Sequence, residues 1–261
     1  MQIEPMHEEY RRLIVSTNLT LTERMKTYYE DVYRIFLPRR MPCIIRIDGK
    51  CFHTFTRGMN KPFDNDLADA MLFAASKLCE EIQGVKLAYW QSDEISLFLT
   101  DYDTLDTQAA YNKNLQKLVS ISASIATAAF NERTRFIDLH RFEYGLEDKF
   151  KSSATFDSRA FVIPKEEVCN YFVDRQLDAS RNSINSVGQA HFSPKQLHAL
   201  NTDMVQDLLF KEKGINWNDL PVIEKRGACV VKNTDGWVVD REIPIFSQDR
   251  EYVNKFVNIG E

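Results

Sequence analysis

The chain has 261 residues, of which 44% are hydrophobic, which is long enough for one packed core of about 150 residues with a C-terminal extension. Its net charge of −5 argues against a protein that coats nucleic acid through a broad basic field, although a local basic groove is possible at pairs such as Lys225 and Arg226. No stretch approaches the roughly 18 to 20 apolar residues of a membrane span, and no signal peptide is evident, so we expect a cytoplasmic protein without a membrane partner.

A helix and a strand are predicted before the first acidic motif. Thr22 can cap a helix whose apolar residues recur at helical spacing up to Phe36, and Pro38 would end it. Residues 43–47 are short, β-branched and mostly apolar, which is typical of a buried strand. Asp48 therefore stands at the carboxyl end of this strand.

Two helices and a hairpin are predicted next. Polar helix-start residues precede apolar positions that mark one helical face over residues 67–82. Residues 85–90 and 95–99 have strand character, and the tetrapeptide between them is typical of a tight hairpin connection. A second long helix is expected from about Gln108 to Asn131.

The predicted fold class is α+β. A fourth strand at 156–163 completes the order strand, helix, strand, strand, helix, strand of ferredoxin-like antiparallel sheets with helices on one face, the arrangement of polymerase palms and nucleotide cyclases. We expect a palm-like domain at 1–164, with an N-terminal helix, and an extension at 165–261 packed on the same core. The extension is expected to contain helices at 166–185 and 202–213 and a hairpin at 228–239.

The two acidic motifs point to chemistry on phosphates. In the predicted sheet the first strand and the strand leading into the hairpin are central neighbours, which brings Asp48 close to Asp93 and Glu94. Carboxylates are the oxygen ligands that Mg²⁺ prefers, and two such ions can activate a hydroxyl and stabilise leaving pyrophosphate. Gly49 would let the backbone approach the phosphates. The alternative is that Asp48 is a turn residue and the other two form a solvated hairpin tip.

Four segments resemble the motifs of the tRNA-histidine guanylyltransferase family. They are RIDGKCFH at 46–53, NKPFD at 60–64, YWQSDEIS at 89–96 and DRQLDASRNSIN at 174–185. The resemblance covers about residues 20 to 190. It implies an enzyme that adds nucleotides to the 5′ end of RNA, in the reverse sense to ordinary polymerases, on a palm-like domain with two Mg²⁺ ions. A 5′-monophosphate would first be activated by ATP or GTP, whereas a 5′-triphosphate end needs no activation.

The resemblance also implies roles for individual residues. The metal ions would be held by Asp48, the Gly49 carbonyl and Asp93. The catalytic set would be Asp48, Asp93, Glu94 and Lys61. Nucleotide binding would fall to Gly49, Lys50, Cys51, Phe52, His53, Ser92, Lys117 and Asn182. RNA binding would fall to Arg159, Lys113 and Arg175. The spacing of Lys113 and Lys117 fits a phosphate clamp on one helix face and equally a solvated face. The alternatives for Lys61 and His53 are an ordinary loop lysine and a hydrogen-bonded structural histidine.

Departures from the family pattern favour one branch of it. Cys51 stands where the family commonly has a second glycine, so close backbone approach to phosphate is less assured. The segment 180–185 resembles bacterial and archaeal Thg-like proteins, which repair 5′-truncated tRNA by template-dependent addition. We therefore expect tRNA and nucleoside triphosphates as partners, and a homotetramer. The alternatives are a tRNA-histidine guanylyltransferase proper, a nucleotide cyclase, or a non-catalytic RNA-binding module with exposed aromatic residues on its central strands.

Overall fold

The computed structural model describes residues 19–257, which divide into two compact units between Phe36 and Leu37. The first unit contains α2 (Leu21–Met25), η1 (Lys26–Glu30) and η2 (Asp31–Tyr33). The predicted cap is wrong, because Thr20 rather than Thr22 begins the helix. The Thr20 hydroxyl accepts a hydrogen bond from Glu23 N, and the Glu23 carboxylate accepts one from Thr20 N.

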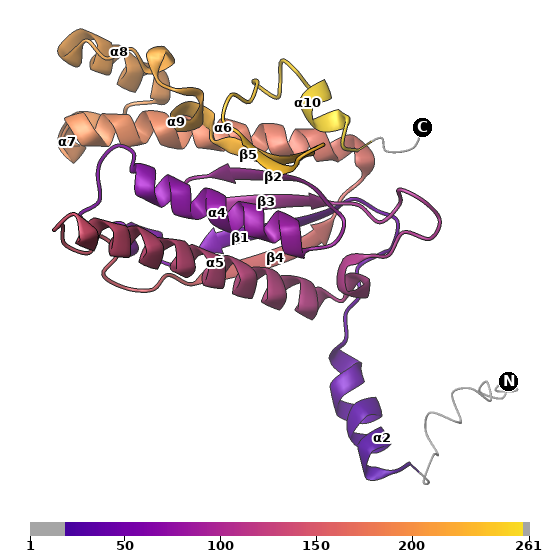
Figure 1. Ribbon diagram of the computed structural model, residues 1–261. Coiled ribbons are helices and arrows are strands. Elements are labelled where there is room, and N and C mark those ends of the chain that lie inside the picture. The colour runs from indigo at the N-terminus through magenta and orange to yellow at the C-terminus, as the bar shows by residue number, and fades with distance from the viewer. Residues whose placement is uncertain (1–18, 258–261) are drawn as a thin grey trace, which may run out of the picture. The chain divides into compact units, whose positions relative to one another are not determined.

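Within the described residues, six strands form one antiparallel sheet in the order β4-β1-β3-β2-β5-β6 (Figure 1). They are β1 (Cys43–Gly49), β2 (Val85–Gln91), β3 (Glu94–Leu99), β4 (Phe156–Val162), β5 (Ala228–Asn233) and β6 (Gly236–Asp240). The first four follow the ferredoxin-like order, so the predicted fold class is confirmed. One predicted neighbour is wrong: β1 pairs with β3, which follows the hairpin turn, and not with β2.

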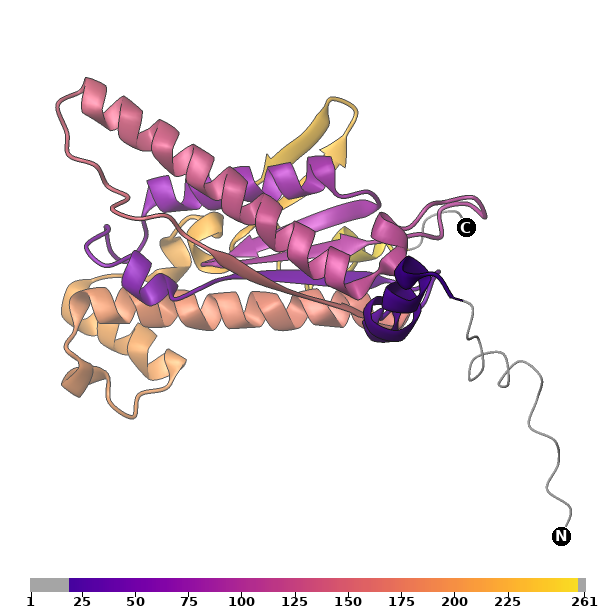
Figure 2. The ribbon, with the colours of Figure 1, turned by 90° about the horizontal axis from the view of Figure 1, so that it is seen from below.

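Helices cover both faces of the sheet. The predicted pair, α4 (Asn65–Glu81) and α5 (Leu115–Glu143), lies on one face, and α6 (Lys165–His191) from the extension lies along the other (Figure 2). Successive β1 side chains point to opposite faces, so Ile45 packs in the core with Met71 of α4, whereas Ile44 packs in the core with Phe172 of α6. The sheet is therefore the middle layer of three.

The second long helix begins and ends later than predicted. A short 3₁₀ segment, η3 (Ala110–Lys113), precedes it, and Tyr111 and Asn112 have φ angles of 47° and 51°, outside the helical range. Asn114 then caps α5 by accepting a hydrogen bond from Lys117 N at 3.0 Å. A helix starting near Gln108 is therefore excluded by the left-handed backbone before the cap.

The extension is fixed to the sheet through the middle of α6. Gln176 is buried, and its Nε2 donates a hydrogen bond to Pro244 O at 2.9 Å, while its Oε1 accepts one from Phe246 N at 2.8 Å. One amide thus uses both of its ends to hold the loop that follows β6.

Short helices complete the fold. They are α3 (Phe52–Phe55), α7 (Pro194–Leu197), α8 (Thr202–Lys213), η4 (Trp217–Asp219), α9 (Val222–Arg226) and α10 (Glu251–Asn254). Across residues 19–257 no helix combines the length and the apolar character needed to cross a membrane. The division into domains at residue 164 stays a prediction, and its outer ends, residues 1–18 and 258–261, lie outside the described part of the chain.

Candidate active site

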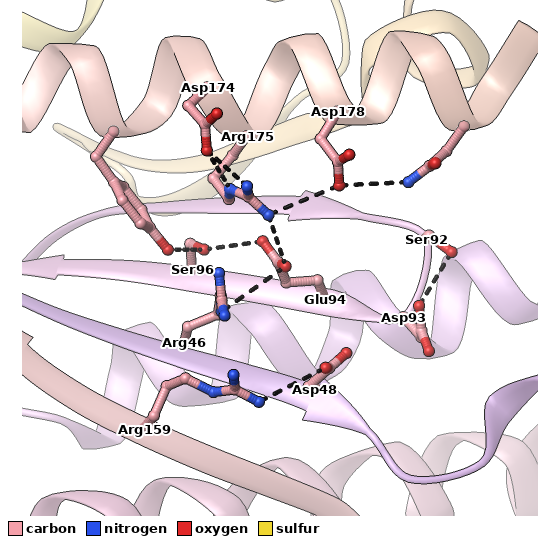
Figure 3. Close-up of polar contacts among 12 residues, drawn as sticks. Arg46, Asp48, Ser92, Asp93, Glu94, Ser96, Arg159, Asp174, Arg175 and Asp178 are labelled. Atoms are coloured by element: carbon pink, nitrogen blue, oxygen red, sulfur yellow. Dashed lines mark hydrogen bonds and ion pairs between the residues drawn. The ribbon is translucent and has the colours of Figure 1, made fainter.

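Asp48 and Asp93 lie at the same end of neighbouring strands. Asp48 is paired in register with Glu94, the first residue of β3, and Gly49 N donates a hydrogen bond to Asp93 O at 3.0 Å. Figure 3 shows both aspartate side chains at the rim where β1 and β3 meet. The predicted meeting of two carboxylates at one rim of the sheet is therefore confirmed.

The tight turn between β2 and β3 is held by side-chain contacts. Ser92 has a left-handed φ of 52°, which lets the chain reverse within two residues. Its hydroxyl donates a hydrogen bond to Asp93 Oδ1 at 3.1 Å, and its carbonyl accepts one from Trp90 Nε1 at 2.8 Å. Ser92 therefore fixes the position of the second carboxylate from the neighbouring residue.

The electrostatics of the pair suit a divalent cation. Burial raises the pKa of Asp93, and the negative charge of Asp48 raises this pKa further. A cation between the carboxylates would relieve that repulsion. No group of three or more acidic, histidine or cysteine side chains gathers anywhere in residues 19–257 as a larger ligand set. The donors fit Mg²⁺, which usually takes one or two carboxylates and completes its coordination with water and substrate phosphates.

Gly49 makes room for an aromatic ring. A Cβ on Gly49 would lie 2.3 Å from Cδ2 of Phe52, so no larger residue fits without moving that side chain. Phe52 is 4% exposed and packs on Phe156, with 5.2 Å between ring centroids. The glycine after the first carboxylate thus has a packing reason in addition to the predicted approach to phosphates.

The segment 50–53, predicted to bind nucleotide, has only some of its backbone amides free to donate to a phosphate. Lys50 N donates to Thr155 O at 2.9 Å, so this amide is already paired. The amides of Phe52 and His53 open α3 and precede its first intrahelical hydrogen bond. Cys51 has a φ of 57°, a conformation that favours glycine, which gives a physical reason for the glycine common in the family.

The predicted lysines have different environments. Lys61 and Lys117 are exposed. Lys113 is 3% exposed; its Nζ donates to Met41 O at 3.1 Å and lies 3.6 Å from Asp101 Oδ1. The prediction of an RNA contact at Lys113, paired with Lys117 on one helix face, is therefore contradicted, because Lys113 precedes the helix and its ammonium is buried.

A cavity of about 490 Å³ adjoins the turn that carries Asp93. The start of α4, the β2–β3 turn, α6, α9 with Gly227, and Arg241 line it, and the predicted residues Ser92 and Asn182 are among its walls. Lys225 and Arg226 also line it. These two were visible in the sequence only as one basic pair among several, and no sequence signal singles out Arg241.

Two arginines lie beside the carboxylate of Glu94. Its Oε2 lies 3.4 Å from Arg175 Nη1 and 3.9 Å from Arg46 Nε (Figure 3). Burial raises the pKa of Glu94, and the two arginines act in the opposite direction. The side chain predicted to lie beside the metal ions is thus engaged with α6, and Arg175, predicted as an RNA contact, is engaged within the protein.

Arg159, predicted to contact RNA, lies beside the carboxylate of Asp48. Its Nη2 is 3.9 Å from Asp48 Oδ2 and 3.4 Å from Asp157 Oδ1, and about half of its side chain is exposed. It can therefore contact a bound phosphate while remaining beside Asp48.

The central strands lack the surface that a base-stacking module needs. Phe98 of β3 and Ile44 of β1 are 0% exposed, because α6 covers this face with Phe172. RNA-recognition modules of the same strand order expose aromatic rings there. This burial argues against the RNA-binding alternative.

Comparison with known protein families identifies the family of the chain. A family model described as tRNAHis guanylyltransferase matches residues 22–164, which is more than half of the chain. The chain belongs to the tRNAHis guanylyltransferase family. Members of this family are nucleotidyltransferases, so the predicted class of enzyme is confirmed.

Relatives within the guanylyltransferase family cover most of the chain. The probable tRNA(His) guanylyltransferase of Dictyostelium discoideum is 29% identical over 202 residues, which span 72% of this chain and 74% of the relative. The tRNA(His) guanylyltransferase of Debaryomyces hansenii is 28% identical over 211 residues, which span 74% of each.

Solved structures of guanylyltransferase-like proteins share the fold. A bacterial tRNA(His) guanylyltransferase (Thg1)-like protein in complex with ATP has a TM-score of 0.84 and 53% identity, covering 92% of this chain and 100% of that chain. One in complex with GTP has a TM-score of 0.75 and 48% identity, with the same coverage. The tRNA(His) guanylyltransferase of Saccharomyces cerevisiae, at 24% identity and a TM-score of 0.67 over 86% of this chain and 99% of that chain, shows the fold alone.

Proposed function

We propose that this protein is a Mg²⁺-dependent 3′-to-5′ nucleotidyltransferase that repairs 5′-truncated tRNA by template-dependent addition. The proposal is carried by the Asp48 and Asp93 pair at the sheet rim, next to a cavity of about 490 Å³. The ATP and GTP complexes of the bacterial Thg1-like proteins support it. ATP or GTP would activate the 5′ end, and nucleoside triphosphates would also be the units added.

The carboxylate pair would hold the metal. Asp48 and Asp93 would bind two Mg²⁺ ions, with the Gly49 carbonyl as a further oxygen ligand. Bound Mg²⁺ would supply Lewis-acid stabilisation of the charge on the transferring phosphoryl group. The burial of Asp93 and its repulsion by Asp48 support this assignment, since a cation would offset both.

The remaining site residues would bind and orient the substrates. Lys61 and Lys117 are exposed and would neutralise phosphate charge, and the Phe52 and His53 amides would donate to phosphate oxygens. Asn182 would orient a nucleotide in the cavity. In the transfer step the 3′-hydroxyl oxygen of the incoming nucleotide forms the new bond to the 5′ phosphorus. The bond to the leaving AMP or GMP, or to pyrophosphate at a triphosphorylated end, breaks, and the hydroxyl proton passes to water.

Repair is favoured over the histidine-specific role. The chain is 53% identical to a bacterial Thg1-like protein and 28–29% identical to the two eukaryotic guanylyltransferases described above. The segment 180–185, on α6 beside the cavity, also resembles the bacterial branch. A cytoplasmic location and a homotetramer belong to the same proposal, and sedimentation equilibrium would measure the assembly.

A substrate comparison tests the proposal. The protein is incubated with Mg²⁺, ATP and GTP, and with a tRNA that lacks its first nucleotide, the same tRNA intact, or an unmodified histidine tRNA. We expect extension of the truncated tRNA until its acceptor stem is paired. Extension of histidine tRNA alone would assign the guanylyltransferase role, and a cyclic nucleotide without RNA product would assign a cyclase. An RNA complex without turnover would contradict the enzyme assignment.

A further inference from the structure

Glu94 is directed away from the rim that its neighbour Asp93 forms. Its side chain is 10% exposed, and Figure 3 shows it pointing toward Arg175 of α6, whereas the Asp93 side chain stays beside Ser92. The second carboxylate oxygen of Glu94 accepts a hydrogen bond from Ser96 Oγ at 3.3 Å. Both oxygens are thus engaged on the α6 side of the sheet.

Arg175 bridges α6 to the start of β3. Its Nε and Nη2 donate to Asp174 Oδ2 at 3.1 and 2.6 Å, and its Nη1 lies 3.4 Å from Glu94 Oε2 and 3.6 Å from Asp178 Oδ2. The side chain is 18% exposed. A planar guanidinium that contacts three carboxylates has little freedom, so it holds Glu94 in one place relative to the helix.

Arg46 lies on the same strand as Asp48, and its contact with Glu94 is longer than that of Arg175. Its Nε lies 3.9 Å from Glu94 Oε2, and it is the one buried side-chain nitrogen or oxygen in residues 19–257 that lacks a hydrogen-bond partner. Arg46 therefore cannot replace Arg175 as the group that fixes Glu94, because its nearest polar atom stays beyond hydrogen-bond distance.

We propose that Arg175 is a positioning residue for the metal-binding pair. By tying Glu94 to α6, it fixes the first residue of β3 so that Asp93 faces Asp48, and it keeps a third carboxylate from turning into the rim. This inference rests on the proposed function in so far as Asp48 and Asp93 bind Mg²⁺. It would replace two roles implied by resemblance, the RNA contact of Arg175 and the place of Glu94 beside the metal ions, because the two side chains contact each other within the protein.

The test measures metal binding without turnover. Mn²⁺ serves as the probe, and its binding is followed by electron paramagnetic resonance with a non-hydrolysable ATP analogue present. One variant is Arg175→Lys, which keeps the positive charge but loses the planar guanidinium with its several donors. The other is the double variant Glu94→Gln with Arg175→Gln. Arg133→Lys is the matched control, because Arg133 forms an ion pair of 2.6 Å with Asp69 between α4 and α5, outside the network. Thermal unfolding is recorded for each variant.

We expect Arg175→Lys to weaken Mn²⁺ binding about 10-fold, at the low end of the losses seen when residues behind the metal ligands are removed. The control should bind Mn²⁺ like the wild type. The double variant removes both buried charges, so its unfolding midpoint should recover toward the wild-type value while Mn²⁺ binding stays weak.

Three results would overturn the inference, two of them in the variants and one in the wild type. Wild-type Mn²⁺ affinity in Arg175→Lys would show that the planar guanidinium is not needed, and recovery of affinity together with stability in the double variant would reveal a purely structural role. If the wild type binds Mn²⁺ and loses this binding with Arg175→Lys but extends no tRNA, the proposed function fails and the inference stands. A wild type that does not bind Mn²⁺ refutes both.

Discussion

Gly227 lies against the backbone of Trp90, so close that a Cβ on Gly227 would be 2.1 Å from the Trp90 carbonyl oxygen. Gly227 also has a φ of 78°. It joins α9 to β5, and both residues line the cavity beside the active-site turn. The absence of a side chain therefore sets how closely α9 approaches β2.

Gly227→Ala should lower the free energy of unfolding by about 3 kcal/mol or more, because backbone strain adds to a clash with a backbone atom. Gly236→Ala is the matched control: its φ is 121°, but an added Cβ meets nothing within 4 Å. Urea unfolding of both variants isolates the clash. Equal losses in the two variants would mean that the approach to Trp90 is not tight.

Asp48→Asn and Asp93→Asn should each reduce nucleotide addition by about 1,000-fold or more while leaving the fold intact, since metal-ion stabilisation of a transition state is worth several kcal/mol. Asp157→Asn, an exposed carboxylate on the neighbouring strand β4, is the control and should retain most activity. Single-turnover assays on triphosphorylated RNA would measure the effect. Near wild-type rates in either variant would remove that aspartate from the metal site.

Asp93→Asn should also change the pH dependence of stability when no divalent cation is present. The folded-state pKa of Asp93 is raised, so the folded protein binds this proton more tightly than the unfolded chain does. The resulting stability is present below the ordinary carboxyl pKa and is lost as the pH rises through the raised value. At pH 7 the asparagine variant should therefore be at least as stable as the wild type. Chemical unfolding at pH 4 and pH 7 tests this, and a variant that is less stable at pH 7 would contradict it.

Lys61→Ala should slow the activation of monophosphorylated RNA more than the extension of triphosphorylated RNA. Lys61 is exposed in the loop before α4, where it can meet the charge that develops during activation. We expect a loss of about 10-fold or more in the first step and a smaller loss in the second. Lys77→Ala, on the exposed side of α4, is the control. Equal losses on both RNAs would contradict a specific role in activation.

Asp101→Asn should destabilise the protein by about 3 to 5 kcal/mol at pH 7, because it leaves the buried ammonium of Lys113 uncompensated. Asp101 is 1% exposed and accepts from Arg39 Nε at 2.8 Å and from Arg40 N at 3.0 Å. Burial alone would raise the pKa of Asp101, but these hydrogen bonds and the charge of Lys113 outweigh burial and lower it.

This contribution of Asp101 is present above the ordinary carboxyl pKa and is lost as the pH falls through the depressed value. The difference between the variant and the wild type should therefore shrink in acid. Asp207→Asn removes an exposed pair with Lys211 and should change stability by less than about 1 kcal/mol at either pH. An Asp101 variant as stable as this control would contradict the proposed role of the buried pair.

The local pattern of the chain was enough for the first four strands and for the rim at which the two carboxylates lie. The apolar run before Asp48 and the short connection that carries Asp93 determine strand ends, and the crossover rule then brings those ends to one rim. The choice between β2 and β3 as the neighbour of β1 could not be made locally, because both strands of the hairpin have the same apolar character. Strand pairing of this kind depends on the whole sheet.

Side-chain partners distant in the sequence explain the remaining errors. Lys113 fits a solvated helix face by spacing, and only the buried carboxylate of Asp101 shows why it is inside. Arg175 and Glu94 are 81 positions apart, and no periodicity connects them. The resemblance to a family locates motifs, but it does not say which charged groups within those motifs neutralise one another.

The two hydrogen bonds of Gln176 have a practical consequence for shortened versions of the protein. Removing the chain from Pro244 onward would take away both partners of a buried amide in the helical turn that also carries Arg175. A truncation designed to simplify crystallisation or expression should therefore keep Phe246. Without both partners of Gln176, the turn of α6 from which Arg175 contacts Glu94 would be disturbed.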